Sequence, residues 1–297
     1  MHLKRITSEA LILIAGILLA SCISKQELPV SKFYDYDFGL PLNDSVELIE
    51  DNDEVKIYSV SFTSIHNQKV TGLLTIPTEA EEPLPVVMLL HGLGDRKTVD
   101  YIEAGHQYFF KAGFAVFRID IDNHGERKEY DYEFDLTDGY KYWTRNVMTQ
   151  TVFDLRRSID FLETRPEIDS DRIGFFGISL GGVIGIVFVG VDDRVKVPVI
   201  ALAGGNLSLM FGLDAMSDET LDFFSIIDPI NFVKEISPRP LLMINAENDE
   251  VIAPITSRML YQKAKDPKEI IWYPSKHRDL PIEKAYPAGI QWFQQHL

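Results

Sequence analysis

The stretch that decides the fold reads Gly177-Ile178-Ser179-Leu180-Gly181. It matches G-x-S-x-G, a pattern in which a serine occupies a sharp turn between a strand and a helix. The context agrees, because residues 173–176 predict a strand before the turn and residues 182–186 predict the first turns of a helix after it. Glycines suit such a turn, since larger side chains would collide with the adjoining strand and helix. The pattern therefore predicts a strained, accessible Ser179 above a helix N-terminus that favours developing negative charge.

Strand-like and helix-like segments alternate on both sides of this turn. Two β-branched stretches, at 55–62 and 70–76, predict a leading antiparallel hairpin. Continuous apolar runs typical of buried strands follow at 85–90, 114–119, 172–176, 197–202, 241–244 and 269–273. Helical patterns lie between these strands, at 101–112, 147–164, 180–189, 255–264 and 282–296. This order predicts an α/β fold with a mostly parallel central sheet and helices on both faces.

A serine hydroxyl is a poor nucleophile unless a base accepts its proton and an acid orients that base. In folds with this serine turn, the acid and then the histidine follow the serine along the chain. Only His277 and His296 follow Ser179. His296 is the penultimate residue of the last helix, whereas His277 lies in the loop after the strand at 269–273. We therefore expect His277 to be the base.

The acid is expected in the loop after the strand at 241–244. This loop offers three carboxylates, of which Asp249 fits best, while Glu247 and Glu250 are more simply interpreted as solvated charges. Asp228 is a more distant alternative.

Residues 54–297 together resemble the α/β-hydrolase superfamily, in particular its dienelactone hydrolase, acetyl xylan esterase and prolyl oligopeptidase-like branch. The run 248–251 is similar to the acid loop of many such hydrolases, and the run 120–127 is similar to the loop after the next strand in that branch. There are two departures. Dienelactone hydrolases use a cysteine where this chain has Ser179, and Lys276 precedes the base where glycine is frequent.

The resemblance implies an oxyanion hole made of two backbone N–H groups. One belongs to Leu180, the residue after the nucleophile. The other is expected in His91-Gly92-Leu93-Gly94, where relatives with this loop pattern use the residue that corresponds to Leu93. His91 itself is interpreted as a structural hydrogen-bonding residue rather than as a second base. Neither a cofactor nor a metal is implied.

The N-terminus is interpreted as a targeting segment. An apolar run of 11 residues at 10–20 follows a short basic region; as a helix it would span about 16 Å, against about 30 Å of hydrocarbon in a bilayer. The run ends in Leu19-Ala20-Ser21-Cys22, which resembles a bacterial lipobox. We therefore expect residues 1–21 to be a lipoprotein signal peptide, Cys22 to be lipidated and residues 22–53 to be a tether. A plain secretory signal with a chance cysteine is the alternative.

Charge and cysteine content exclude several classes of protein. The chain has 29 Lys and Arg against 45 Asp and Glu, a net charge of −16, which argues against nucleic acid and against a polybasic contact with anionic lipid. Its one cysteine provides neither an intrachain disulfide nor a Cys-based zinc site.

Two insertions, near 125–144 and 204–233, offer the only hints of substrate. The first contains six aromatic residues, namely Tyr130, Tyr132, Phe134, Tyr140, Tyr142 and Trp143. They would either stack on a sugar or an aromatic acyl group, or form a packing core of their own. Apolar residues in the second insertion suggest a short cap that shapes an acyl pocket or completes the core.

The sequence thus predicts a serine hydrolase of the bacterial cell envelope that cleaves carboxylic esters through an acyl-enzyme, with acyl groups on saccharides as candidate substrates. One alternative is a peptidase of the prolyl oligopeptidase type, disfavoured because no propeller-sized segment is present in the sequence. The other is a non-catalytic envelope binding protein on a hydrolase scaffold, disfavoured because a full set of triad residue types occurs in the right order.

Overall fold

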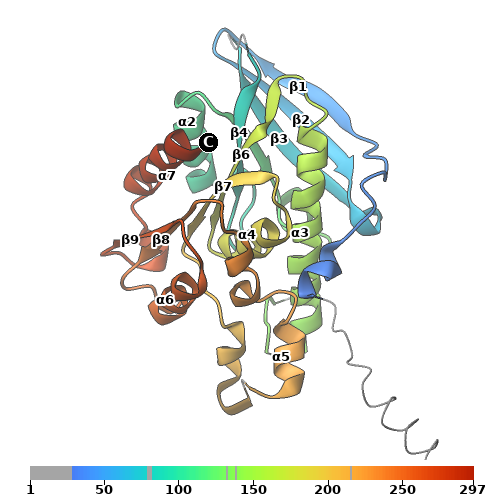
Figure 1. The fold of residues 1–297 in the computed structure, drawn as a ribbon. Helices are drawn as coiled ribbons and strands as arrows, with labels where there is room; N and C mark the ends of the chain where they lie inside the picture. Colours follow the sequence, from blue (N-terminus) through green and yellow to red (C-terminus); the bar gives the residue numbers. More distant parts are fainter. Residues whose placement is uncertain (1–28, 79–81, 132, 138, 215) are drawn as a thin grey trace, which may run out of the picture.

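A nine-stranded sheet forms the centre of the molecule (Figure 1). The structure is a computed structural model and describes residues 29–78, 82–131, 133–137, 139–214 and 216–297. Its strands, in chain order, are β1 (Ser45–Asp51), β2 (Val55–Thr63), β3 (Lys69–Pro77), β4 (Leu84–Leu90), β5 (Ala115–Ile119), β6 (Ile168–Ile178), β7 (Val195–Ala201), β8 (Leu241–Ala246) and β9 (Lys268–Tyr273).

The strand order across the sheet is β1-β2-β3-β5-β4-β6-β7-β8-β9. The pairs β1–β2, β2–β3 and β3–β5 are antiparallel, and the other pairs are parallel. The predicted mostly parallel sheet with a leading antiparallel hairpin is confirmed. Because the parallel strands point the same way, the loops after β4, β5, β6, β8 and β9 meet at one edge, where functional groups of such sheets gather.

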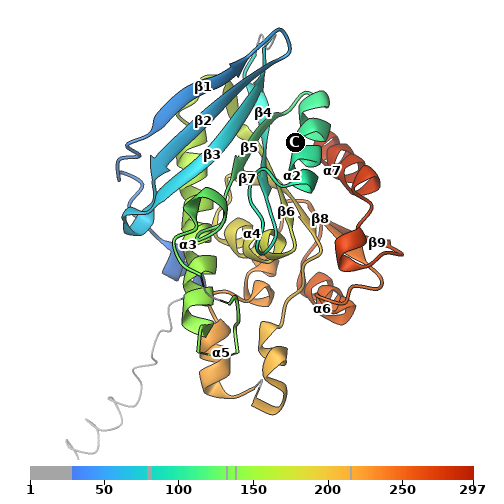
Figure 2. The ribbon, with the colours of Figure 1, turned by 180° about the vertical axis from the view of Figure 1, so that it is seen from behind.

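Helices cover both faces of this sheet (Figures 1 and 2). They are α2 (Asp100–Lys111), α3 (Lys141–Leu162), α4 (Leu180–Val191), α5 (Asp218–Phe224), α6 (Pro254–Lys263) and α7 (Ile282–His296). Short 3-10 turns connect them, namely η1 (Val30–Tyr34), η2 (Ile65–Asn67), η3 (Gly125–Arg127), η4 (Leu207–Asp214), η5 (Pro229–Asn231), η6 (Val233–Glu235) and η7 (His277–Asp279). No helix in the part of the chain that the structure describes is long and apolar enough to cross a bilayer.

Alternate side chains of β4 enter two separate hydrophobic cores. Val86 and Met88 pack with residues of α3 and α4 on one face, whereas Val87 and Leu89 pack with residues of α2 and α7 on the other. A strand buried on both faces needs apolar residues at every position. This is why the run at 85–90 could be recognised from the sequence as a central strand.

The N-terminal boundary of the domain differs from the prediction. The sequence predicted a tether over residues 22–53, yet β1 adds an antiparallel strand to the sheet edge. Ahead of it, Tyr34 is fully buried and donates a hydrogen bond to the carbonyl oxygen of Ile226 at 2.7 Å. The prediction is therefore wrong from residue 30 onward. The predicted signal peptide, with Cys22 after it, lies outside the described residues.

The two insertions meet at the edge of the sheet where the active-site loops lie. α3 begins at Lys141 rather than at the predicted residue 147, so its first turns belong to the first insertion. The second insertion forms η4, α5, η5 and η6. Figures 1 and 2 show α5 beside the first turns of α3, and the rings of Tyr142 and Phe223 are 5.5 Å apart between centroids.

Candidate active site

Ser179 occupies the turn between β6 and α4 with φ 55° and ψ −120°, a strained conformation for a residue with a side chain. The neighbouring glycines allow the close packing of this turn. A Cβ atom on Gly177 would lie 2.4 Å from the carbonyl oxygen of Gly181, and a Cβ atom on Gly181 would lie 2.4 Å from that of His91. The turn therefore has the geometry that the sequence predicted.

The side chains of Ser179, His277 and Asp249 form a continuous hydrogen-bonded relay. The Oγ of Ser179 lies 2.9 Å from Nε2 of His277, and Nδ1 of His277 lies 2.7 Å from Oδ2 of Asp249. The other carboxylate oxygen of Asp249 accepts hydrogen bonds from the amides of Val251 and Ile252, at 2.8 and 2.7 Å. Because the carboxylate only accepts, Nδ1 carries the imidazole proton, and Nε2 is left to accept the serine proton.

The alternative residues take no part in this relay. Asp228 is buried and accepts hydrogen bonds from the amides of Asn206, Leu207 and Ile230, so it organises the second insertion. Burial raises the pKa of the Asp228 carboxyl, and the hydrogen bonds from those amides lower it by less. His296 is exposed at the end of α7.

Glu250 has a closer contact with the relay than the sequence indicated. Its carboxylate accepts a hydrogen bond from the backbone N–H of His277 at 3.2 Å. Hydrogen bonds from its own amide and from that of His277 lower the pKa of Glu250. Nothing in the local sequence indicates this contact, because it joins two loops 27 residues apart.

The loop after β4 lies against the nucleophile. A Cβ atom on Gly92 would be 3.3 Å from Cβ of Ser179. Leu93 follows in this loop, and Leu180 is the first residue of α4, where an amide has no acceptor within its own helix. The loop that carries Leu93 and the first residue of α4 thus both lie next to Ser179.

Tyr101, which the sequence analysis did not single out, holds this loop in place. Its hydroxyl accepts a hydrogen bond from the Gly92 amide at 2.7 Å and donates one to Asp95 at 2.8 Å. Burial raises the pKa of Tyr101 above its usual value, so the hydroxyl keeps its proton for that bond. The Gly92 amide is therefore already hydrogen-bonded to Tyr101.

His91 is a structural residue, as predicted. It is fully buried, its Nδ1 donates to the carbonyl oxygen of Gly92 at 2.7 Å, and its Nε2 accepts from the amide of Ile121 at 3.0 Å. Burial lowers the pKa of His91 to about 4, which keeps the ring neutral at neutral pH. The ring joins the loop after β4 to the loop after β5.

A buried ion pair joins the same two loops. The ammonium of Lys97 lies 2.7 Å from Oδ2 of Asp120 and 2.9 Å from the carboxylate of Glu126. The Lys97 side chain is 3% exposed and that of Asp120 is fully buried. Asp120 also accepts a hydrogen bond from the Lys97 amide at 2.7 Å.

Replacing Lys97 by methionine should lower the free energy of unfolding by about 3 kcal/mol, because it leaves the buried Asp120 without its cation. Chemical denaturation would measure this change. Lys128→Met is the matched control, since it removes an exposed lysine that pairs with the exposed Asp131. This variant should have a denaturation midpoint near that of the wild type. An unchanged midpoint for Lys97→Met would show that the buried pair contributes nothing to stability.

A cavity of about 240 Å³ opens at the relay. Apolar side chains make up much of its wall, among them Leu202, Val251, Leu280 and Ile282. Within the described part of the chain, no group of three or more His, Cys, Asp or Glu side chains is placed to hold a metal ion.

The aromatic residues of the first insertion differ in how they are packed. Phe134 packs against the core and Tyr142 against Phe223. Tyr130 and Trp143 keep about half of their surface exposed, and their ring centroids lie 5.4 Å apart. Tyr132 lies outside the described residues.

Comparison with known proteins places the chain in a family. A model of the acetyl xylan esterase (AXE1) family matches residues 40–202, more than half of the chain. The chain belongs to the acetyl xylan esterase family. The match begins ahead of β1, which agrees with the corrected N-terminal boundary, and it includes Ser179 but ends before Asp249 and His277.

Individual proteins of known sequence or structure are similar to this chain. The chain is 25% identical over 275 residues to the acetyl esterase Axe7A of Xylanibacter ruminicola, an alignment that covers 82% of this chain and 60% of that protein. It therefore spans less than two thirds of that relative. The acetyl xylan esterase from Paenibacillus sp. R4 has the same fold, with a TM-score of 0.76 at 21% identity, over 92% of this chain and 96% of the other. Acetyl xylan esterase 1 from Thermoanaerobacterium sp. JW/SL YS485 also has this fold, with a TM-score of 0.72 at 18% identity, over 90% of this chain and 92% of the other.

Proposed function

We propose that this protein is a serine esterase that removes short acyl groups, such as acetyl, from saccharides. The observation that carries the proposal is the relay of Ser179, His277 and Asp249, with distances of 2.9 and 2.7 Å, in a member of the acetyl xylan esterase family. The names of the relative and of the two similar structures support acetyl groups as the acyl part.

Acylation begins when Oγ of Ser179 attacks the ester carbonyl carbon while Nε2 of His277 accepts the hydroxyl proton. Asp249 stabilises the imidazolium that forms. The amides of Leu93 and Leu180 donate hydrogen bonds to the oxyanion of the tetrahedral intermediate. His277 then gives its proton to the departing alcohol oxygen, and the acyl group stays on Ser179.

Deacylation repeats these steps with water. His277 accepts a proton from a water molecule, which attacks the acyl carbon, and the carboxylic acid leaves as Ser179 regains its proton. The small cavity with partly apolar walls supports a short acyl group, because it offers little space beside the relay.

The test is to incubate the purified protein with acetylated xylo-oligosaccharides and to measure released acetate, beside feruloylated saccharides, plain acyl esters and aminoacyl amides. The expected result is acetate release together with covalent labelling by a fluorophosphonate. Fluorophosphonate labelling together with hydrolysis of the aminoacyl amides, but of none of the esters, would favour the peptidase. Absence of both labelling and turnover would favour the non-catalytic binding protein.

We also propose that Cys22 is lipidated and anchors the protein at the bacterial cell envelope; the lipobox-like run before it supports this. Cys22→Ala should abolish lipid attachment and membrane fractionation, because acylation needs the thiol, while ester hydrolysis, which does not use this thiol, continues. Metabolic labelling with a palmitate analogue and cell fractionation would measure the effect. Membrane association that persists in this variant would contradict the proposal and favour an uncleaved anchor.

A further inference from the structure

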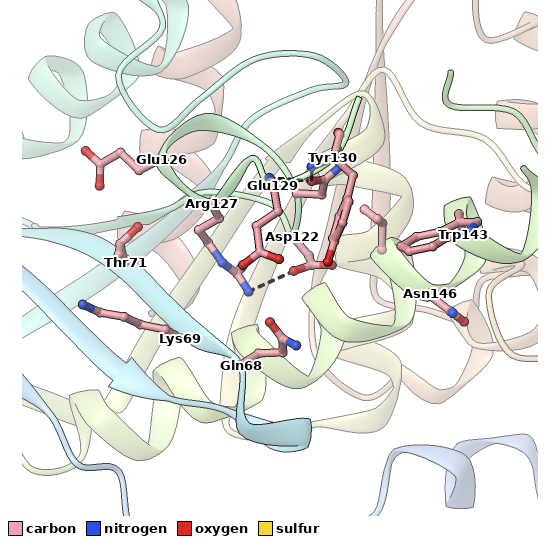
Figure 3. Close-up of a pocket in the computed structure, with 12 residues that line it drawn as sticks. Gln68, Lys69, Thr71, Asp122, Glu126, Arg127, Glu129, Tyr130, Trp143 and Asn146 are labelled. Carbon is pink, nitrogen blue, oxygen red and sulfur yellow. Dashed lines mark hydrogen bonds and ion pairs between the residues drawn. The ribbon is translucent and has the colours of Figure 1, made fainter. Parts of the chain in front are cut away.

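A second cavity, of about 420 Å³, lies at the same edge of the sheet on the side of the β2–β3 hairpin (Figure 3). Its walls come from three parts of the chain. Figure 3 shows Gln68 and Lys69 on the hairpin, Asp122 and Arg127 in the loop after β5, and Trp143 on α3.

This cavity and the catalytic cavity are neighbours but have no lining residue in common. The ring of His91, in the loop after β4, lies 5.6 Å between centroids from the ring of His124, in the loop that lines the second cavity. Lys97, in the loop that carries Leu93, forms an ion pair with Glu126, which lines the second cavity. The loops that line the two cavities therefore contact each other at this edge of the sheet.

Two cationic side chains, Lys69 and Arg127, and three anionic ones, Asp122, Glu126 and Glu129, line the second cavity. Arg127, whose side chain is 5% exposed, pairs with Asp122 at 3.2 Å and with Asp154 at 2.7 Å, so its charge is compensated. Glu126 pairs with Lys97. Burial raises the pKa of Asp122 to about 6, which weakens its negative charge near neutral pH. Such a lining, with a small excess of negative charge, disfavours an anionic ligand, and it offers hydrogen-bond donors and acceptors to a neutral one.

The aromatic pair gives the cavity an apolar surface. Tyr130 is 54% exposed and Trp143 is 50% exposed, with their rings inclined by 55°. The backbone of Tyr130 is fixed by Asn123, whose side chain exchanges two hydrogen bonds of 2.9 Å with it. A pyranose ring presents C–H groups to an aromatic face and hydroxyl groups to polar neighbours, and so matches both parts of this lining.

We propose that this cavity is a subsite for the neutral pyranose chain of an oligosaccharide, which packs on Tyr130 and Trp143 while Ser179 attacks an acyl group of the same molecule. The proposal rests on the proposed function and specifies its substrate as a chain of sugars rather than a free small ester.

The kinetic test compares acetylated xylo-oligosaccharides with 4-nitrophenyl acetate. In Trp143→Ala, the ratio of kcat/KM for the oligosaccharide to kcat/KM for the small ester should fall about tenfold, mainly through KM, which matches the loss of one aromatic contact. Trp143→Phe should recover most of the ratio. The matched control is Tyr142→Ala, because Tyr142 is the next residue, is 52% exposed and does not line the cavity. A ratio in Trp143→Ala equal to that in Tyr142→Ala would overturn the subsite and leave the esterase proposal intact.

A binding experiment separates the subsite from catalysis. Calorimetric titration of the Ser179→Ala protein with unacetylated xylohexaose should give binding that Trp143→Ala, added to Ser179→Ala, weakens about tenfold. Circular dichroism would verify that the variants are folded. Binding that depends on Trp143, without any acetate release by the wild type, would support the subsite and overturn the esterase proposal. Absence of binding to the folded Ser179→Ala protein would overturn the subsite.

Discussion

Ester turnover by Ser179→Ala should be roughly 10⁴–10⁶-fold below that of the wild type, because the variant lacks the hydroxyl oxygen that would form the acyl-enzyme. In the structure, Oγ of Ser179 is the group that faces Nε2 of His277 at 2.9 Å. The remaining activity would come from substrate binding and from the amides of Leu93 and Leu180, which the substitution leaves in place. Initial rates on 4-nitrophenyl acetate and on acetylated saccharides would measure the decrease.

Two controls accompany this measurement. The variant should lose fluorophosphonate labelling but keep its melting temperature, because alanine fits the turn and the hydroxyl contributes little packing. A chelator should not change the wild-type rate if the serine is the nucleophile. Undiminished turnover by the folded Ser179→Ala protein, or a wild-type rate lost to chelation, would refute the acyl-enzyme mechanism.

Asp249→Asn should lower kcat by about 10⁴-fold. The substitution removes a negative charge, and it also makes a proton-bearing group face His277. The amides of Val251 and Ile252 both donate to Oδ1 of Asp249, so they would hold the oxygen of the new side chain in that position. Its NH₂ group would then face Nδ1 of His277. Two donors cannot bond to each other, so the imidazole would take the tautomer with its proton on Nε2, which cannot accept the serine proton.

Glu250→Gln is the matched control for the acid. It changes the adjacent carboxylate, which contacts the backbone of His277 rather than its ring, so kcat should stay within a few-fold of the wild type. Glu247→Gln should behave in the same way. The acid assignment would be refuted if Asp249→Asn were nearly silent, or if the two glutamate variants lost as much activity.

The parts of the fold that were predictable from sequence are those where physical constraints act on adjacent residues. The strand at 85–90 is buried on both faces and is therefore apolar throughout. The turn at Ser179 requires glycine on both sides because backbone atoms lie where a Cβ would be. The fixed order of serine, acid and histidine left His277 as the only suitable base, and the geometry brings it to Ser179.

The missed features depend on contacts between distant parts of the chain. β1 is an edge strand whose side chains are mostly exposed, so it does not need the apolar pattern by which strands are recognised. Tyr101, Lys97 and Glu250 are ordinary polar residues in their local context. They belong to the site because they contact partners on other loops that meet at this edge of the sheet. The start of α3 was missed because its first turns carry half-exposed aromatic residues in place of a regular apolar stripe.

If the protein is anchored through Cys22, the burial of Tyr34 limits how far the domain can stand from the membrane. Its side chain is enclosed in the domain, which fixes the chain to the domain surface near residue 30. If Cys22 carries the lipid, the seven steps from residue 22 to residue 29 can extend at most ~25 Å. The enzyme would then work as a surface-bound catalyst confined to a thin layer above the bilayer, and soluble saccharides would have to diffuse into that layer to be deacylated.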